Sequence, residues 1–314
     1  MKIYEYKPGQ PLNIGDCVLA IGLFDGMHIA HRDLLDCARE LAKERALPFG
    51  IFTFGSEGGI KRDTSKIYDT KQKLVLAERA GAELAVVADF GTLAGLSAEE
   101  FVRQTLVRDC GVRIAVAGFN FRFGCGASAG AAELCELMSA EGGLAVIREE
   151  FRLDGEAVSS SLIRGFIERG DMAEAGRLLG APYSIAGAVH HGDGRGRGLG
   201  LPTANTEIPT GRTLPAKGVY RAAVPIDGRI YNAVTNIGTC PTFGERAVHA
   251  ETYIIDFDGD LYGRDLEIFL LGYLRGERSF ASREELIMQI KLDIYNTKTK
   301  NGELTWQELG LNLQ

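Results

Sequence analysis

The sequence lacks an apolar run long enough to cross a membrane, for which about 20 residues are needed. Its first ten residues, MKIYEYKPGQ, contain no apolar signal core. An excess of basic residues is missing as well, because the formal net charge is −7 at pH 7. This charge argues against non-specific binding of nucleic acid as the main activity. We therefore expect a cytoplasmic protein whose partners include neither a membrane nor a nucleic acid.

Closely spaced cysteine pairs are also missing. The six cysteines are scattered, with no CxxC pair: Cys17, Cys37, Cys110, Cys125, Cys135 and Cys240. Such spacing predicts reduced thiols rather than disulfides or zinc ligands. The remaining composition, 45% hydrophobic and 25% charged over 314 residues, is typical of a globular chain with two domains.

The first half of the chain alternates short apolar runs with stretches of helical periodicity. The apolar runs predict strands at 18–24, 49–54, 84–88, 114–117 and 144–147. The periodic stretches predict helices at 28–46, 69–80, 97–110 and 131–140. This alternation predicts an α/β domain with a doubly wound parallel sheet, and a site at the carboxyl ends of its strands.

The pattern changes near residue 182. A short helix at 171–179 is stopped by Gly180, and Pro182 prevents its continuation. Short strands then follow at 183–189, 218–226, 229–235, 249–256 and 265–270. Five or six strands without intervening helices predict a small antiparallel β-barrel, followed by a terminal helix at 282–295. We therefore predict two domains, 1–182 and 183–314.

Two histidines stand at the start of the first predicted helix. His28 and His31 lie three residues apart, so both imidazoles point the same way. Because strand, glycine turn and helix present a helix N-terminus to phosphate, we interpret the pair as groups that stabilise a phosphate during nucleotidyl transfer. Two alternatives stay open: polar residues at an exposed helix start, or a metal-binding pair that lacks a nearby third ligand.

Two later segments offer polar groups that suit a nucleotide. Asn120 follows a predicted strand directly, in a loop where its amide can hydrogen-bond a nucleotide. Ser160 and Ser161 place hydroxyls at a helix N-terminus, and Arg164 follows one turn later. That arrangement suits a triphosphate. The alternative is a serine N-cap beside a solvated arginine.

The stretch GDGRGRGLGLPTAN, residues 192–205, is the most unusual in the chain. Alternate glycines give it a backbone that bends freely and approaches a ligand closely. In an extended segment, Thr203 and Asn205 fall on one face, where hydroxyl and amide oxygens suit a metal-bound polyphosphate. An RGRG patch for nucleic acid and a solvated linker are the alternatives.

Glu251 lies in a predicted strand and shares one face with Tyr253 and Ile255. A carboxylate among apolar side chains is expected to have a partner or a proton to handle. Glu251 is therefore a candidate catalytic acid or base.

The stretch at 192–205 resembles the riboflavin kinase signature, as do the segments at 217–220, 236–244 and 251–263. The resemblance implies ATP-dependent phosphorylation of riboflavin to FMN by a small barrel. It assigns Glu251 as general base, and Thr203 and Asn205 as ligands of Mg²⁺ and the phosphates. It also implies that the glycine loop and its arginines cover the phosphates: Gly192, Gly194, Arg195, Gly196 and Arg197.

In the first half, G-x-F-D-G-x-H-x-x-H at 22–31 resembles the nucleotidylyltransferase signature in its FAD synthetase form. GFNFRFG at 118–124 and SSSLIR at 159–164 resemble two further motifs of that group. Over roughly residues 15 to 296 the chain is similar to the bacterial bifunctional riboflavin kinase/FAD synthetases. The resemblance implies a Rossmann-like domain that transfers AMP from ATP to FMN, giving FAD and pyrophosphate. The implied nucleotide-binding residues are Gly22, Phe24, Asp25, Gly26, Asn120, Ser160, Ser161 and Arg164.

The sequence departs from this pattern at several points. Gly55-Ser56-Glu57-Gly58-Gly59 stands where relatives carry Pro-His-Pro, Ala30 replaces a glycine, and Ala131 replaces an aspartate. Phe121 and Phe123 fit core packing as well as flavin stacking. Two other functions therefore stay open: a riboflavin kinase with a degenerate nucleotide-binding domain, and a flavin-responsive, RNA-binding regulator.

Overall fold

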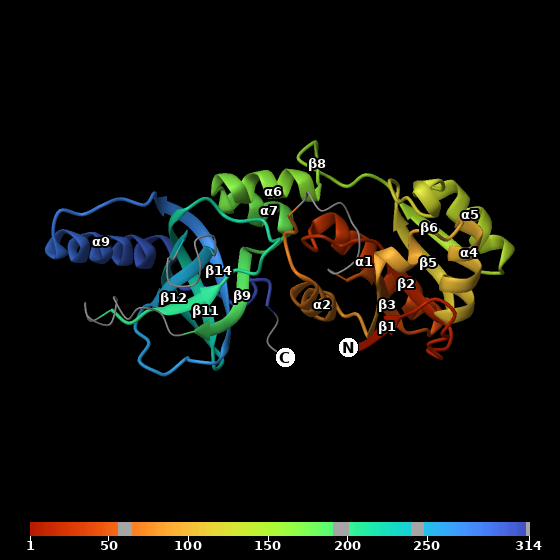
Figure 1. The fold of residues 1–314 in the computed structure, drawn as a ribbon, viewed down its shortest axis with the longest axis horizontal. Helices are drawn as coiled ribbons and strands as arrows, with labels where there is room; N and C mark the ends of the chain where they lie inside the picture. Colours follow the sequence, from red (N-terminus) through yellow and green to blue (C-terminus); the bar gives the residue numbers. More distant parts are fainter. Residues whose placement is uncertain (56–64, 191–200, 240–247, 312–314) are drawn as a thin grey trace. The chain divides into compact units, whose positions relative to one another are not determined.

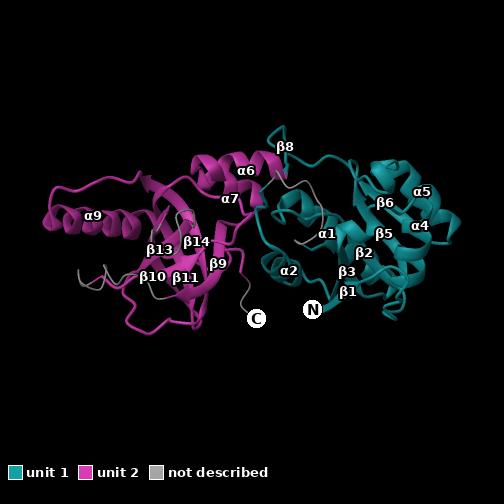
Figure 2. Ribbon diagram, viewed as in Figure 1, with its two compact units in different colours: residues 1–159 teal, residues 160–314 magenta. Residues whose placement is uncertain are grey.

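The structure is a computed structural model that describes residues 1–55, 65–190, 201–239 and 248–311 (Figure 1). The chain forms two compact units, Met1–Ser159 and Ser160–Gln314 (Figure 2). The second unit includes helices α6 (Ser160–Arg169) and α7 (Met172–Leu179), because they pack on each other and α7 packs on two barrel strands. The boundary at residue 182 stays a prediction.

The first unit is built on a six-stranded parallel sheet, which confirms the predicted fold class. Its strands lie in the order β1-β4-β3-β2-β5-β6. Their bounds are β1 (Lys2–Tyr6), β2 (Cys17–Ile21), β3 (Phe49–Phe54), β4 (Leu84–Ala88), β5 (Val112–Gly118) and β6 (Leu144–Arg148). From β2 the chain builds outward through β3 and β4, and then crosses to β5 and β6. The strand order therefore reverses between β2 and β5, the place where such sheets bind ligands.

Helices cover both faces of this sheet. The longer ones are α1 (Ile29–Arg45), α2 (Thr70–Arg79), the π-helix η1 (Phe101–Asp109) and α5 (Ala131–Ala140). Three single-turn helices, α3 (Phe90–Leu93), α4 (Ala98–Glu100) and η2 (Cys125–Ala127), and the hairpin β7 (Arg152–Leu153) and β8 (Glu156–Ala157) complete the unit. Alternate residues of β2 serve the two faces: Val18 packs in the cluster with α1, and Leu19 in the cluster with η1 and α5. Burial on both sides explains the unbroken apolar run of β2.

Three elements differ from the sequence expectations. The strand expected to reach Phe24 ends at Ile21, because Phe24 has a φ of +51°, which an extended strand does not allow. The helix expected at 97–110 is mostly the π-helix η1. The edge strand β1 was not predicted, since its exposed residues are partly charged.

The second unit is a closed antiparallel barrel, also as predicted. Its strands run in the order β10-β13-β12-β11-β14-β9. Their bounds are β9 (Tyr183–His190), β10 (Ala204–Glu207), β11 (Gly218–Ile226), β12 (Arg229–Thr239), β13 (Val248–Ile254) and β14 (Asp265–Arg275). Fully buried side chains such as Tyr183 and Tyr220 fill its core. The sequence prediction omitted β10, because this strand has only four residues and most of them are polar.

The terminal helix α9 (Arg283–Asn301) is longer than predicted. Its buried Asp293 accepts hydrogen bonds from Arg275 of β14, with Nη2 2.8 Å from Oδ2, and this ion pair holds α9 on the barrel. The tail beyond α9 packs Leu309 and Leu311 against Ala223 and Phe269. Among the described helices, none combines the length and the apolar character needed to cross a bilayer.

Candidate active sites

The loop between β2 and α1 is a tight bend at the carboxyl end of the sheet. Phe24, Gly26 and Met27 all have positive φ values, of +51°, +87° and +45°. A side chain at Gly26 would be strained, since its φ is +87° and a Cβ would lie 2.8 Å from Ile67 Cδ1. Asp25 closes the bend by accepting the Ile67 N–H at 2.8 Å. Backbone strain of this kind persists only where the surrounding structure holds it in place, and it is concentrated at functional sites.

The bend brings the rings of His28 and His31 into direct contact. Their rings stack with centroids 3.6 Å apart and planes 16° apart, and Phe24 meets the His31 ring edge-on. His28 is only 4% exposed, so the alternative of an exposed helix start is wrong. Within the described ranges, neither Nδ1 atom has a hydrogen-bond partner. Two buried, unsatisfied ring nitrogens side by side are available to a ligand.

Burial sets the charge of this pair. It lowers the pKa of His28 to about 4. It also lowers the pKa of His31 well below its usual value, with additional effects of His28 and Lys73. Both imidazoles are therefore neutral near pH 7. In the part of the chain that the structure describes, no group of three or more His, Cys, Asp or Glu side chains is placed to hold a metal ion.

The other predicted residues of the first site fall on two elements. Asn120 is exposed in the turn that follows β5. Strand β5 lies next to β2, at the point where the strand order reverses. Phe123 is buried in the core, whereas Phe121 is half-buried and stacks on it at 5.6 Å. Core packing thus accounts for Phe123.

Ser160, Ser161 and Arg164 begin α6, which belongs to the second compact unit. Arg164 Nη2 donates to Ser161 Oγ at 2.8 Å, so the cation and a hydroxyl lie together in the first turn of the helix. Of the departures noted above, Ala131 starts α5 and Ala30 lies in α1. Residues 56–59 lie outside the described part of the chain.

The second site lies on the outer face of the barrel. Ala204 and Thr206 of β10 are buried, and Thr203, Asn205 and Glu207 alternate with them on the other side. Thr203 Oγ1 donates a 2.8 Å hydrogen bond to Glu251 Oε1. The predicted hydroxyl, amide and carboxylate therefore meet at one place.

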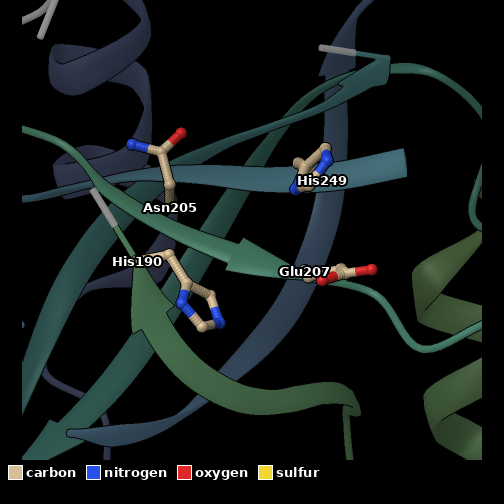
Figure 3. Close-up of a pocket in the computed structure, with 4 residues that line it drawn as sticks. All are labelled: His190, Asn205, Glu207 and His249. Atoms are coloured by element: carbon tan, nitrogen blue, oxygen red, sulfur yellow. The ribbon is translucent and has the colours of Figure 1, made fainter. Parts of the chain in front are cut away.

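Strand register extends this group across the barrel. Glu251 is paired with Asn205 on one side and with Asn236 on the other, and Asn205 is paired with His190. Facing partners in antiparallel strands share a face, so one polar row crosses four strands. Two residues further along, Glu207 faces His249. His190, Asn205, Glu207 and His249 line a small hollow (Figure 3).

A third carboxylate, after Glu251 and Glu207, approaches the same face. Gly238 faces His249 across β12 and β13, and a Cβ at Gly238 would lie 2.5 Å from Glu277 Oε1. The absent side chain thus makes room for the exposed carboxylate of Glu277. The predicted glycine-loop residues, Gly192, Gly194, Arg195, Gly196 and Arg197, lie outside the described residues.

Sequence reasoning missed Asn236, Glu277 and Lys73. Asn236 lies in the Asn-Ile-Gly segment, but its place beside Glu251 depends on strand order. Lys73 could have been noticed as a cation among the buried positions of α2, which also include Gln72 and Ala77.

Comparisons with known proteins agree with this division of the chain. The FAD synthetase family model matches residues 11–162, and the riboflavin kinase model matches residues 179–300. A bifunctional riboflavin kinase/FMN adenylyltransferase of Pseudomonas fluorescens is 37% identical over 287 residues, covering 88% of this chain and 91% of the relative. The protein of that name from Bacillus subtilis is 33% identical, covering 88% and 90%.

The fold has a solved counterpart. A crystal structure described as a macrolide-efflux protein from Streptococcus pneumoniae is 31% identical, with a TM-score of 0.83. The match covers 95% of this chain and 99% of that one. Identity above 30% over most of both chains, with both family models in their expected order, establishes the relationship. The chain therefore belongs to the bifunctional riboflavin kinase/FMN adenylyltransferase family.

Proposed function

We propose that the chain converts riboflavin to FAD in two ATP-dependent steps, one at each site described above. It contains both a FAD synthetase domain and a riboflavin kinase domain. The observation that carries the assignment of residues is the Thr203–Glu251 hydrogen bond, with Asn205 and Asn236 on either side of Glu251.

In the kinase step, Glu251 accepts the proton of the riboflavin 5′-hydroxyl while that oxygen attacks the γ-phosphorus of ATP. ADP leaves as the bond to the γ-phosphorus breaks. The Thr203 hydrogen bond fixes the orientation of the carboxylate. Phosphoryl transfer depends mostly on positioning and charge stabilisation, so few protein groups are needed.

The oxygens near Glu251 fit Mg²⁺. Thr203 Oγ1 and the Asn205 amide oxygen are hard neutral ligands, and Mg²⁺ is often held by a few such atoms together with substrate phosphates. Because Thr203 donates its hydroxyl hydrogen in the bond to Glu251, the lone pairs of its oxygen remain available to Mg²⁺. When bound, Mg²⁺ would neutralise charge on the ATP phosphates.

In the adenylyl step, a phosphate oxygen of FMN attacks the α-phosphorus of a second ATP, and pyrophosphate leaves. His28 and His31 stabilise charge on the α-phosphate, with Gly22 to Gly26 as the backbone that approaches the nucleotide. Asn120 contacts the nucleotide, and Ser160, Ser161 and Arg164 hold the pyrophosphate. The unsatisfied ring nitrogens and the reversal of strand order support this assignment.

The proposed partners are riboflavin, FMN, FAD and ATP. We place the reaction in the cytoplasm, with neither a membrane nor a nucleic acid as partner. The net charge of −7 supports this part of the proposal.

Incubating the purified protein with riboflavin, ATP and Mg²⁺ and separating the flavins by chromatography tests the proposal. Conversion through FMN to FAD is expected. FMN without FAD would limit the activity to the kinase, as the departure at residues 55–59 suggests. Unchanged riboflavin would overturn both assignments.

A further inference from the structure

Lys73 brings a buried ammonium group to the carboxyl ends of β2 and β3. Its side chain extends from α2, and the residue is 7% exposed. Nζ donates to Thr53 Oγ1 and to the Phe54 carbonyl, both at 2.9 Å, and to the Leu23 carbonyl at 3.1 Å. Each N–H group of the ammonium thus has an acceptor. All three acceptors are neutral oxygens, so none of these bonds neutralises the charge.

These bonds join two separate segments. Leu23 lies in the bend that leads to His28, whereas Thr53 and Phe54 end β3. The Thr53 hydroxyl in turn donates to the Leu23 carbonyl at 3.2 Å, so Lys73, Thr53 and Leu23 form a closed ring of hydrogen bonds. Leu23 directly precedes the first positive-φ residue of the bend. The lysine therefore fixes the backbone at the point where the strained turn begins.

The charge of Lys73 also acts on His31. Burial lowers the pKa of Lys73 to about 8; Lys66 adds to this effect and Asp25 opposes it. Lys73 in turn helps to lower the pKa of His31, after burial and His28. The titratable groups that act here are thus His28, His31, Lys66, Lys73 and Asp25. Burying a cation whose hydrogen-bond partners are all neutral is costly, and an anionic ligand nearby would offset that cost.

We propose that Lys73 is a positioning residue of the adenylyltransfer site: it fixes the backbone of the histidine loop and holds a positive charge near His31 for the phosphates of the nucleotide. The inference rests on the proposed adenylyltransferase function. The polyphosphate of the substrate then supplies counter-charge to Lys73 in addition to the Asp25 carboxylate, which raises the pKa of Lys73.

The test compares Lys73→Met, which keeps the length of the side chain without its charge, with Lys73→Arg, which keeps the charge. In K73M, kcat for FMN adenylylation should fall about 10²-fold, the effect expected for a misplaced reacting group, with a smaller change in KM. K73R should restore part of this loss. NMR titration of the His31 ring in the free protein should show a higher pKa in K73M than in the wild type, and a wild-type value in K73R.

Thr53→Val separates geometry from charge, because it removes the two bonds of the ring that involve the Thr53 hydroxyl and leaves the ammonium. It should lower kcat without moving the His31 pKa. Riboflavin phosphorylation by the same samples reports on the integrity of the second unit and should not change.

Wild-type adenylylation by K73M would overturn the proposal, and so would a loss of rate without a shift of the His31 pKa. If hydrogen exchange shows that K73M does not fold its first unit, T53V decides: wild-type adenylylation by T53V, or a shifted His31 pKa in it, would overturn the proposal. If the wild type itself made no FAD, the proposed function would fail, whereas the His31 titration would still test the charge of Lys73.

Discussion

Thr203 Oγ1 donates a 2.8 Å hydrogen bond to Glu251 Oε1, although the two residues lie 48 positions apart in the chain. The contact forms because β10 and β13 are neighbours in the barrel and pair Asn205 with Glu251. It places a hydroxyl that suits a metal ion directly against the proposed base.

Replacing Glu251 by Gln should abolish most kinase turnover. General-base catalysis contributes about 10²–10⁴-fold, so kcat for riboflavin phosphorylation should fall within that range while ATP binding is largely retained. Steady-state kinetics and a nucleotide-binding titration measure the two effects, and FMN adenylylation by the same sample is the control. A loss below tenfold would remove Glu251 from this role.

Thr203→Val and Thr203→Ser form a matched pair. The valine variant loses the hydroxyl, and a hydrogen bond to a charged group contributes about 1.5–3 kcal/mol, which corresponds to about 10- to 10²-fold in rate. Kinase activity should fall by this factor in T203V, and the Mg²⁺ concentration for half-maximal rate should rise. T203S should stay close to the wild type. Equal activity of the two variants would show that the hydroxyl is dispensable.

Gly26→Ala should damage the first site alone. At a φ of +87° an alanine costs about 1–2 kcal/mol, and its Cβ would also collide with Ile67. Gly15→Ala is the matched control, because Gly15 has a φ of +84° but no atom within 4 Å of a Cβ. Thermal unfolding and adenylylation rates should be affected more in G26A than in G15A. Equal effects would mean that the packing of the bend on Ile67 is unimportant.

The histidine pair should make the first unit sensitive to acid. Burial lowers the pKa of His28 to about 4 in the folded state, whereas its ordinary value, expected in the unfolded chain, is near 6.5. Below about pH 6.5 the unfolded chain therefore binds more protons than the folded protein. The free energy of unfolding should therefore fall as pH drops from about 6.5 towards 4, by roughly 3 kcal/mol for this residue. Hydrogen exchange of β2 and α1 as a function of pH measures the effect. His28→Gln should reduce the slope, and an unchanged slope would contradict the prediction.

Much of the fold followed from local patterns. Apolar runs located β3 and β4 to the residue, and the change of pattern near Pro182 indicated a barrel after an α/β domain. Strand β10 was not predicted, because a four-residue polar strand is stable only when paired with β9 and β13. The bend at Phe24 was not predicted either, because its positive φ values are imposed by tertiary contacts, such as that between Gly26 and Ile67.

The placement of the candidate site residues was predictable where those residues are close in sequence. The alternation of Thr203 and Asn205 and the spacing of His28 and His31 follow from strand and helix geometry. The row that links His190, Asn205, Glu251 and Asn236 depends on strand order instead, which local sequence does not encode. The same holds for Lys73, whose hydrogen bonds reach the ends of two different strands.

The division of labour between the two sites is tested most directly by mixing two variants. Glu251→Gln should make FAD from FMN but not FMN from riboflavin. A protein with both His28→Ala and His31→Ala should make FMN from riboflavin but not FAD from FMN. Mixing them with riboflavin, ATP and Mg²⁺ should restore FAD, measured by chromatography. If either variant lost both activities, or if the mixture produced no FAD, two separate sites would not explain the activity.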